Sequence, residues 1–396
     1  MNDWLPLEDA QERLLALAPA PRSEEVPTQS ALGRILARDI RARRTQPPAD
    51  LSAMDGYAVR GEGPWQVVGE SRAGSPFAGA LASSEAVRIS TGAAMPEGGE
   101  SVLIQEEATR DGDTLHAAEP LSSGRHIRRR GFDFGEGDTL LEAGCEIGAA
   151  QIALAMAGGH GSLSVAVPPT VAVLDSGDEL AADPEALGRG QIPASNGAMI
   201  AALLAPHVGE SRRIGPVADD MDALVRALAE AEECDILVTS GGASVGDHDL
   251  VQAALREWGA QLAFWKVAIR PGKPLMVAER AVAGRRQVIL GLPGNPVSSF
   301  VTTLLFAVPL VRASLGASRV LPELRTARLA EGLPAGGSRR EFLRGIRSGG
   351  EVRRAGSQDS SALRALAAAD CLIVRPADAP AASAGEQVRI LSLRNG

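Results

Sequence analysis

Three short apolar segments, each followed by a loop of small polar residues and then a helical pattern, lie between residues 171 and 300. The first, at 171–174 (Val-Ala-Val-Leu), is continuously apolar, as expected of a parallel strand buried on both faces. The other two lie at 236–239 and 288–290, and helical patterns follow at 196–204, 222–233, 249–258 and from Pro296 onward. This βαβ order restricts the region to a right-handed, mostly parallel sheet covered by helices.

The chain on either side of this region has a different character. Short β-like runs alternate with glycine turns between residues 50 and 144, and the chain beyond Leu321 is strand-like and rich in arginine. Further helical spacing is found at 7–18, 30–37 and 148–158. We therefore predict an α/β and β multidomain protein: a parallel-sheet α/β domain, a β-rich module and a small C-terminal β-domain.

Composition excludes several classes of protein. A net charge of −9 argues against a general nucleic-acid binder, and three cysteines far apart in the sequence argue against a disulfide framework. The five histidines form no HExxH pattern of a zinc enzyme. The most apolar run, 297–311, is short and interrupted, and the first residues lack the pattern of a signal peptide, so we expect a cytoplasmic protein without a membrane span.

Lysine is rare among the basic residues, and its two occurrences lie close together. Of 40 lysines and arginines only two are lysines, Lys266 and Lys273, and both lie within residues 266–274. Because arginine serves everywhere else, this segment is expected to need compact positive charges that a planar guanidinium does not replace. The alternative is a chance cluster.

The three loops after the predicted strands carry the candidate binding residues. Such loops meet at the carboxyl edge of a doubly wound sheet, where glycines let the backbone approach an anion and hydroxyls and helix N-termini donate to it. With the two lysines they predict a phosphate or oxyanion pocket. Its residues are Ser176, Gly177, Asp178, Ser240, Gly241, Gly242, Ser244, Gly246, Asp247, Lys266, Lys273, Pro293, Gly294, Asn295, Pro296 and Ser298.

The same loops contain Asp178, Glu179, Asp247 and Asp249. Carboxylates would repel a phosphate unless a hard cation lies between them, so Mg²⁺ is the expected metal. The alternative is that Asp178 and Asp249 cap helices and that Glu179 is solvated.

The β-rich segment carries a second cluster, with Asp55 in Ser-Ala-Met-Asp-Gly-Tyr, Thr91 in Thr-Gly-Ala-Ala-Met-Pro, and Asp133 after the basic run 125–130. From the residues alone, Asp55 and Thr91 are ordinary turn residues. The basic run is either an anion-steering element or a solvated strand edge.

Seven ordered motifs make the chain resemble the MoeA family of molybdopterin molybdotransferases, which is related to the C-terminal part of gephyrin and to its plant counterpart. They are SAMDGYAV (52–59), TGAAMPEG (91–98), IRRRGFDF (127–134), SGDEL (176–180), SGGASVGDHD (240–249), KVAIRPGKP (266–274) and LPGNPVSS (292–299). The resemblance spans roughly residues 5–380. It departs at Ser176, Arg270 and Leu51, where family members commonly have threonine, lysine and asparagine.

The resemblance implies an elongated homodimer whose active cleft lies between the α/β domain of one subunit and the inserted β-domain of the other. The implied domains are an N-terminal helical linker domain (1–44 plus 136–168), an inserted β-rich domain (45–135), a MogA-like α/β molybdopterin-binding domain (169–317) and a C-terminal β-barrel-like domain (318–396).

The implied reaction inserts molybdate into adenylyl-molybdopterin and releases AMP with Mg²⁺. By motif, the residues matched to activity are Asp55, Thr91, Asp133, Glu179, Asp219 and Asp249, and Glu179 and Asp249 serve the metal. The resemblance also matches Lys266, Arg270, Lys273 and Ser298 to anion-binding positions and Pro293 and Pro296 to prolines that shape the site. Implied partners are a MogA-type protein and recipient molybdoenzymes. Two other functions stay open, a gephyrin-like scaffold without catalysis and an enzyme that inserts tungsten.

Overall fold

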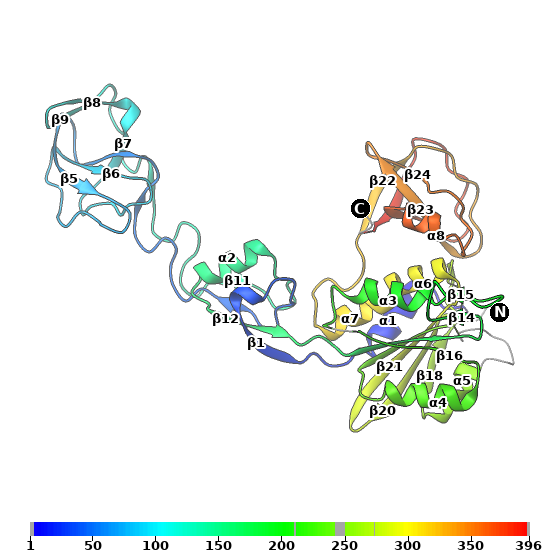
Figure 1. Cartoon of the computed structure of the whole chain (residues 1–396). Helices are drawn as coiled ribbons and strands as arrows, with labels where there is room; N and C mark the ends of the chain where they lie inside the picture. Colours follow the sequence, from blue (N-terminus) through cyan, green and yellow to red (C-terminus); the bar gives the residue numbers. More distant parts are fainter. Residues whose placement is uncertain (1–3, 210, 242–249, 273, 394–396) are drawn as a thin grey trace.

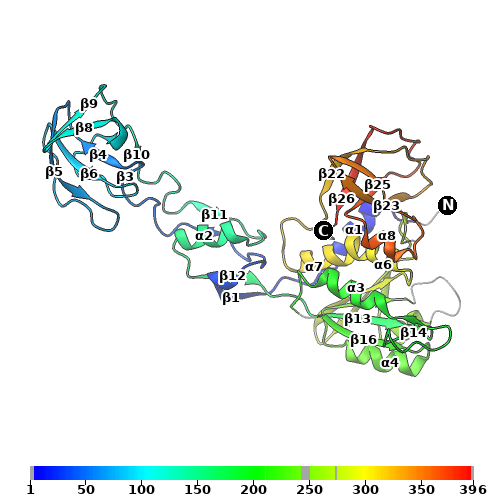
Figure 2. The ribbon, with the colours of Figure 1, turned by 45° about the horizontal axis from the view of Figure 1, so that its top comes forward.

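The computed structural model describes residues 4–209, 211–241, 250–272 and 274–393, and Figure 1 shows an elongated molecule. The α/β unit and the C-terminal barrel form a body at one end. A six-stranded β unit, here called the distal unit, lies at the other end, and a narrow linker unit joins the two (Figures 1 and 2).

The α/β unit is built on a six-stranded sheet with the strand order β16-β13-β17-β21-β20-β18. The parallel strands are β13 (Val171–Ser176), β16 (Ser211–Val217), β17 (Ile236–Ser240) and β21 (Arg285–Leu292). The antiparallel strands are β20 (Met276–Val282) and β18 (Gln261–Trp265), which run along one edge. The prediction of a mostly parallel α/β sheet is confirmed, since four of six strands are parallel.

Helices cover both faces of this sheet because its central strands are buried on both sides. One face packs against α1 (Leu7–Leu15), α3 (Ser195–Leu204) and the long helix Pro296–Ser314, which comprises α6 (Pro296–Thr302), the π-helical turn η3 (Thr303–Ala307) and α7 (Val308–Ser314). The other face packs against α4 (Met221–Glu230) and α5 (Leu250–Glu257).

The long helix Pro296–Ser314 is apolar enough and long enough to cross a membrane by composition, but 83% of its most apolar window is buried inside the protein. Its apolar character is therefore accounted for by the core that it fills.

The C-terminal barrel is a closed sheet in the order β23-β24-β22-β26-β25, and β25 pairs back with β23. Its strands are β22 (Leu324–Leu329), β23 (Arg340–Ser348), β24 (Glu351–Arg354), β25 (Cys371–Arg375) and β26 (Gln387–Ser392), and the short helix α8 (Leu363–Ala367) lies beside them. Strand β19 (Ile269–Arg270) of the α/β unit pairs with β23, with Ile269 opposite Arg340. This pairing attaches the barrel to the α/β unit.

The distal unit holds the six-stranded sheet β7-β4-β6-β5-β9-β8. Its strands are β4 (Gly56–Val59), β5 (Trp65–Ser71), β6 (Glu85–Ile89), β7 (Ser101–Ile104), β8 (Ala108–Asp111) and β9 (Thr114–Ala117), with η2 (Gln105–Glu107) between β7 and β8 and the small pair β3 (Leu51–Ser52) and β10 (Ile127–Arg128) alongside.

The linker unit contains the pairs β1 (Ser23–Pro27) with β12 (Ser162–Ala166) and β2 (Ile40–Arg41) with β11 (Thr139–Leu141), the turn η1 (Thr28–Ser30) and the helix α2 (Ala149–Ala157). The helix predicted at 30–37 is wrong. Leu36 instead makes a bridge with Val165, because the packing of this small unit overrides a short helical pattern.

Helix α1 packs in the core of the α/β unit through Leu7, Ala10 and Leu14, and Leu5 makes a bridge with Val267. The resemblance implies a linker domain that begins at residue 1. We propose that it starts at Ser23 instead, and that the four divisions at 44/45, 135/136, 168/169 and 317/318 are as expected.

Candidate functional site

A cavity of about 930 Å³ lies between the carboxyl edge of the α/β sheet and the C-terminal barrel. The ends of three neighbouring strands form its floor, because Asp175, Ser240 and Leu292 lie in register across β13, β17 and β21. The predicted binding and catalytic residues that line it are Ser176, Gly177, Glu179, Asp219, Gly241, Arg270, Pro293, Gly294, Asn295 and Ser298.

Four further predicted residues belong to the same unit without lining this cavity. Asp178 accepts a hydrogen bond from the amide of Asp219 at 3.0 Å, Ser240 is buried at the end of β17, and Pro296 is the first residue of α6. Lys266 is half-buried, and its carbonyl accepts the amide of Leu5 at 3.1 Å. Gly242, Ser244, Gly246, Asp247, Asp249 and Lys273 lie outside the described residues.

Gly177 shows why a small residue is needed in the first loop. Its φ of +146° lies in a region that side chains rarely adopt, and a Cβ there would lie 2.5 Å from Oε2 of Glu179. The Glu179 carboxylate therefore lies against the backbone of Gly177. The glycine thus leaves room for this acid at the cavity wall.

The acidic side of the cavity carries excess negative charge. Burial, followed by the charges of Asp178 and Glu179, raises the pKa of Asp219 above its usual range, although a hydrogen bond from the backbone of Asp178 to the Asp219 carboxylate opposes the shift. No ion pair joins these three acids to a cation within the described part of the chain. The group is therefore suited to a positive ligand.

The three acids Asp178, Glu179 and Asp219 have the chemistry to bind Mg²⁺. This ion prefers carboxylate oxygens and is often held by one or two of them together with substrate phosphates. No group of three or more histidine, cysteine or acidic side chains able to hold a metal occurs among the described residues. A complete protein cage is therefore not formed by that part of the chain, and a metal here would depend on substrate oxygens.

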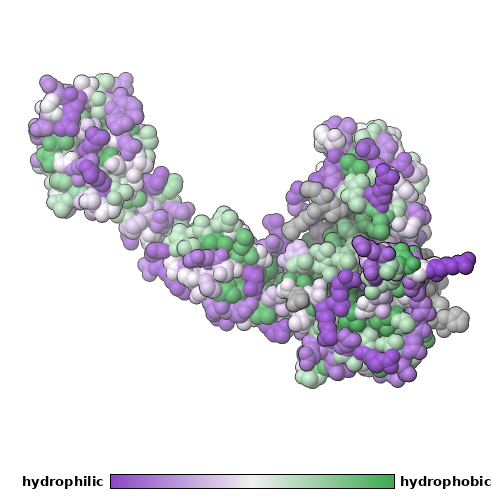
Figure 3. All heavy atoms as spheres, in the orientation of Figure 1, coloured by the Kyte–Doolittle hydropathy of each residue, from purple (hydrophilic) through white to green (hydrophobic). Residues whose placement is uncertain are grey.

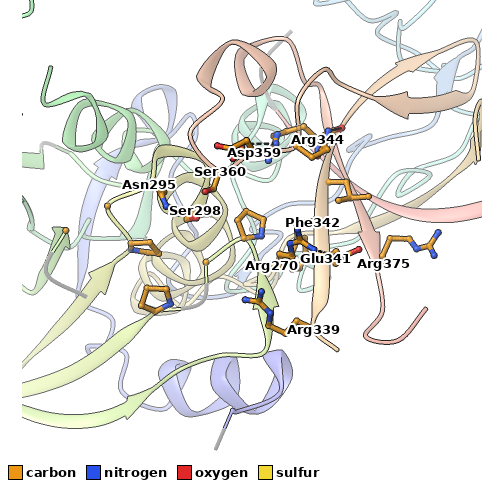
Figure 4. Close-up of a pocket in the computed structure, with 18 of the residues that line it drawn as sticks. Arg270, Asn295, Ser298, Arg339, Glu341, Phe342, Arg344, Asp359, Ser360 and Arg375 are labelled. Atoms are coloured by element: carbon orange, nitrogen blue, oxygen red, sulfur yellow. Dashed lines mark hydrogen bonds and ion pairs between the residues drawn. The ribbon is translucent and has the colours of Figure 1, made fainter. Parts of the chain in front are cut away.

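The opposite wall comes from the barrel and was not predicted. It includes Arg339, Arg344 and Arg375, together with Glu341, which pairs with Arg270 at 3.1 Å (Figure 4). Arg354 also lines the cavity. The C-terminal segment is rich in arginine, but its sequence pattern does not indicate which of these arginines line the cavity.

Arg344 is the largest fully buried side chain in the described structure, with a relative exposure of 1%. Its Nη2 donates to the carbonyl oxygens of Ser357 at 2.7 Å and Asp359 at 3.0 Å. Burial lowers its pKa, and the charge of Asp359 opposes that shift. A buried guanidinium held by carbonyls and by no ion pair of the described residues leaves positive charge on this wall.

The first turn of α6 closes the cavity between these two walls. Figure 4 shows Asn295 and Ser298 at its start, below Ser360 of the barrel. The amide of Val297 donates to the carbonyl of Ser360 at 3.0 Å. The hydroxyl-bearing residues Ser176 and Ser298 are both buried at the cavity wall, so the site combines hydroxyl donors with opposite charges on its two sides.

Three of the predicted catalytic residues do not line the cavity of their own chain. They are Asp55, Thr91 and Asp133. They belong to the distal unit and its connection, at the far end of the molecule from the barrel (Figures 1 and 2). Asp55 and Thr91 are nevertheless neighbours, since Oδ1 of Asp55 accepts the amide of Thr91 at 2.7 Å. The amide of Asp133 donates to the carbonyl of Gln46 at 3.0 Å.

Three family models match successive parts of the chain. They are described as the MoeA N-terminal region (domain I and II) at residues 5–159, a probable molybdopterin binding domain at 172–313, and the MoeA C-terminal region (domain IV) at 326–393.

Relatives match over the whole length. A molybdopterin molybdenumtransferase of Haemophilus influenzae is 36% identical over 98% of both chains, and one of Staphylococcus aureus is 32% identical over 98% of this chain and 95% of its own. A crystal structure of a molybdopterin biosynthesis moeA protein from Pyrococcus horikoshii OT3 superposes with a TM-score of 0.86 at 27% identity. It covers 99% of this chain and 100% of its own.

Proposed function

The chain belongs to the MoeA family of molybdopterin molybdenumtransferases, and from this premise we propose that it inserts molybdenum from molybdate into adenylyl-molybdopterin and releases AMP. The observation that carries the proposal is the cavity with acids on one wall and arginines on the other. A substrate with a phosphate ester, a diphosphate bridge and an oxyanion co-substrate needs both kinds of charge in one place.

The chain's own residues bind and orient the substrate. Ser176 and Ser298 donate hydroxyl hydrogen bonds, and Gly241 and Gly294 let the backbone come close to anionic oxygens. Arg270 and Arg344 add positive charge at the barrel side, and the family positions Lys266 and Lys273 complete the proposed anion-binding set. Pro293 and Pro296 shape the turn that leads into α6.

The proposed metal residues are Glu179 and Asp249, with Asp219 beside them. Bound Mg²⁺ would supply the positive charge that lets carboxylates and substrate phosphates share one site. Support comes from the acids that lie together here, since Asp178 accepts the amide of Asp219 at 3.0 Å and Glu179 and Asp219 both line the cavity.

We propose a homodimer in which Asp55, Thr91 and Asp133 of one subunit complete the cleft of the other. Two observations support it. The distal unit is far from the cavity of its own chain (Figure 1). Helix α2 is apolar, yet only Ala155 of its nine residues is buried, and hydrophobic residues gather over the linker unit in Figure 3.

The proposal extends to the surroundings of the reaction. Adenylyl-molybdopterin is expected from a MogA-type partner, and the product is expected to pass to molybdoenzymes in the cytoplasm. Neither membrane nor nucleic acid takes part in the proposed reaction.

The direct experiment supplies purified protein with adenylyl-molybdopterin, molybdate and Mg²⁺ and measures AMP together with pterin-bound molybdenum. Stoichiometric AMP and bound molybdenum are expected, with loss of both after chelation. AMP release that persists in the chelator would remove the metal from the mechanism.

Two outcomes separate the alternative functions. A scaffold protein would bind the pterin substrate and release no AMP. An enzyme specific for tungsten would leave molybdate unincorporated in a mixture with tungstate, which elemental analysis of the product would reveal.

A further inference from the structure

Asp175 is a buried acid directly below the cavity floor, and the reaction outlined above does not use it. It lies at the end of β13, immediately before the cavity residue Ser176, and its side chain is 3% exposed. Its Oδ1 accepts the amide of Gly197 at 3.0 Å in the first turn of α3, and Nη2 of Arg213 lies 3.7 Å from its Oδ2. The carboxylate therefore joins the first strand end to the start of a helix.

Gly197 provides the space that this contact needs. A Cβ at position 197 would overlap with the Asp175 carboxylate, with all three nearest atoms belonging to that side chain. Gly197 does not have a positive φ, so its requirement comes from the close approach of the acid and not from the backbone conformation.

The residue before Gly197 continues the connection to the third cavity loop. Nδ2 of Asn196 donates to the carbonyl of Gly294 at 2.7 Å, and Gly294 lines the cavity between Pro293 and Asn295. The Oδ1 atom of Asn196 is buried without a hydrogen-bond partner in the described part of the chain, so within that part the bond from Nδ2 to Gly294 is what orients this side chain. One continuous path of contacts thus runs from the first loop to the third. It is made of Asp175, Gly197, Asn196 and Gly294.

We propose that Asp175 and Asn196 are positioning residues that set the separation of the first and third cavity loops. Gly197 has no side chain and so leaves room for the Asp175 carboxylate. They contact neither substrate nor metal. The inference rests on the proposed function, since its readout is binding and turnover at that cavity.

Charge alone does not account for this arrangement. Burial raises the pKa of the Asp175 carboxyl, while the charge of Arg213 and the hydrogen bond from the Gly197 amide oppose that rise. A buried acid costs stability unless it is paired or hydrogen-bonded. Asp175 lies in strand β13 and is not the N-cap residue of α3, which is Ala194. Its placement at the base of the cavity is consistent with a requirement for loop geometry.

The test uses full-length protein and compares Asp175→Ala and Asn196→Ala with Asp220→Ala. Asp220 accepts the amide of Ala223 at 2.9 Å at the start of α4, so its loss removes a similar carboxylate–helix bond without touching the path described above. Both path variants should raise KM for molybdate about tenfold or more, with a smaller change in kcat, because a displaced loop weakens positioning. Asp220→Ala should lower the melting temperature and leave KM unchanged.

A double-mutant cycle makes the spatial claim specific. Gly197→Ala should raise KM strongly in the native background and only slightly beside Asp175→Ala, because the overlap with the carboxylate is then gone. Asp175→Asn, which keeps the acceptor, should restore most of the native KM.

Equal effects of Gly197→Ala in both backgrounds, or a native KM in Asp175→Ala and Asn196→Ala, would overturn the inference. Absence of AMP release by the wild-type protein would instead overturn the proposed function. Direct titration with molybdate alone gives a second readout: weaker binding by the path variants supports the inference, and unchanged binding contradicts it.

Discussion

At the scale of single residues, Asp219 shows how burial and neighbouring charges affect stability. The pKa of Asp219 is raised, so its ionised form is less stable in the folded protein than in the unfolded chain. The stabilisation linked to this group is complete below the unfolded pKa and declines as the pH rises through the higher folded value.

Asp219→Asn should therefore increase the free energy of unfolding at pH 7 and leave it nearly unchanged at about pH 3, where the carboxyl is protonated. Urea denaturation at both pH values measures this, and Glu62→Gln, an exposed acid of the distal unit, is the control. The same variant should lose AMP release. Lower stability at pH 7 than at pH 3 relative to wild type would contradict the electrostatic explanation.

Arg344 supports both the barrel and the proposed anion wall. Arg344→Met leaves the carbonyls of Ser357 and Asp359 without their donor and should lower the free energy of unfolding by about 1–3 kcal/mol. It should also weaken molybdate binding measured by calorimetry, whereas Arg344→Lys should lose less of both. Arg347→Met changes an arginine of the same strand that is paired with Asp370 and should leave molybdate binding as in wild type.

At the scale of elements, the long helix Pro296–Ser314 connects the cavity to the core. Its first turn lies at the cavity, and its later residues pack between the sheet and the barrel within a single hydrophobic cluster. Destabilising its middle should therefore affect the α/β unit as a whole.

Phe306 is fully buried in that helix, so Phe306→Ala should lower the free energy of unfolding by about 3–5 kcal/mol. Phe132→Ala makes the same change at a side chain that is 74% exposed, and a shift within about 0.5 kcal/mol is expected. Chemical denaturation measures both. Similar losses in the two variants would show that burial does not determine the effect.

At the scale of the whole molecule, the distance between the distal unit and the cavity makes the dimer proposal testable by complementation. Asp55→Ala and Glu179→Ala subunits should each be inactive alone. Half of randomly mixed dimers contain one of each, and one of their two clefts carries no substitution, so about a quarter of the wild-type activity should return.

Activity should be measured after the two variants are unfolded and refolded together, with each variant treated alone as the control. No recovery in a mixture shown by native mass spectrometry to contain heterodimers would mean that Asp55 and Glu179 do not belong to clefts shared between subunits.

Much of the α/β unit was accessible from sequence. The apolar runs at β13, β17 and β21 and the glycine loops after them predicted both the sheet and the edge at which Ser176, Gly241 and Gly294 lie. Strands β16, β18 and β20 were not predicted. Exposed polar residues interrupt β16, and β18 and β20 form an antiparallel pair at the edge of the sheet, outside the βαβ order that the sequence indicated. The resemblance added the family and the order of the outer units.

The sequence by itself determined the local patterns and the family, because hydrophobic periodicity and loop composition are properties of neighbouring residues. Only the tertiary structure decided that Ile269 pairs with Arg340 and that Arg344 is enclosed by the segment 357–359. It also decided that the Asp175 carboxylate occupies the room left by the missing side chain of Gly197. These contacts join residues far apart in the chain, and their partners are selected by how whole units pack, which no local pattern encodes.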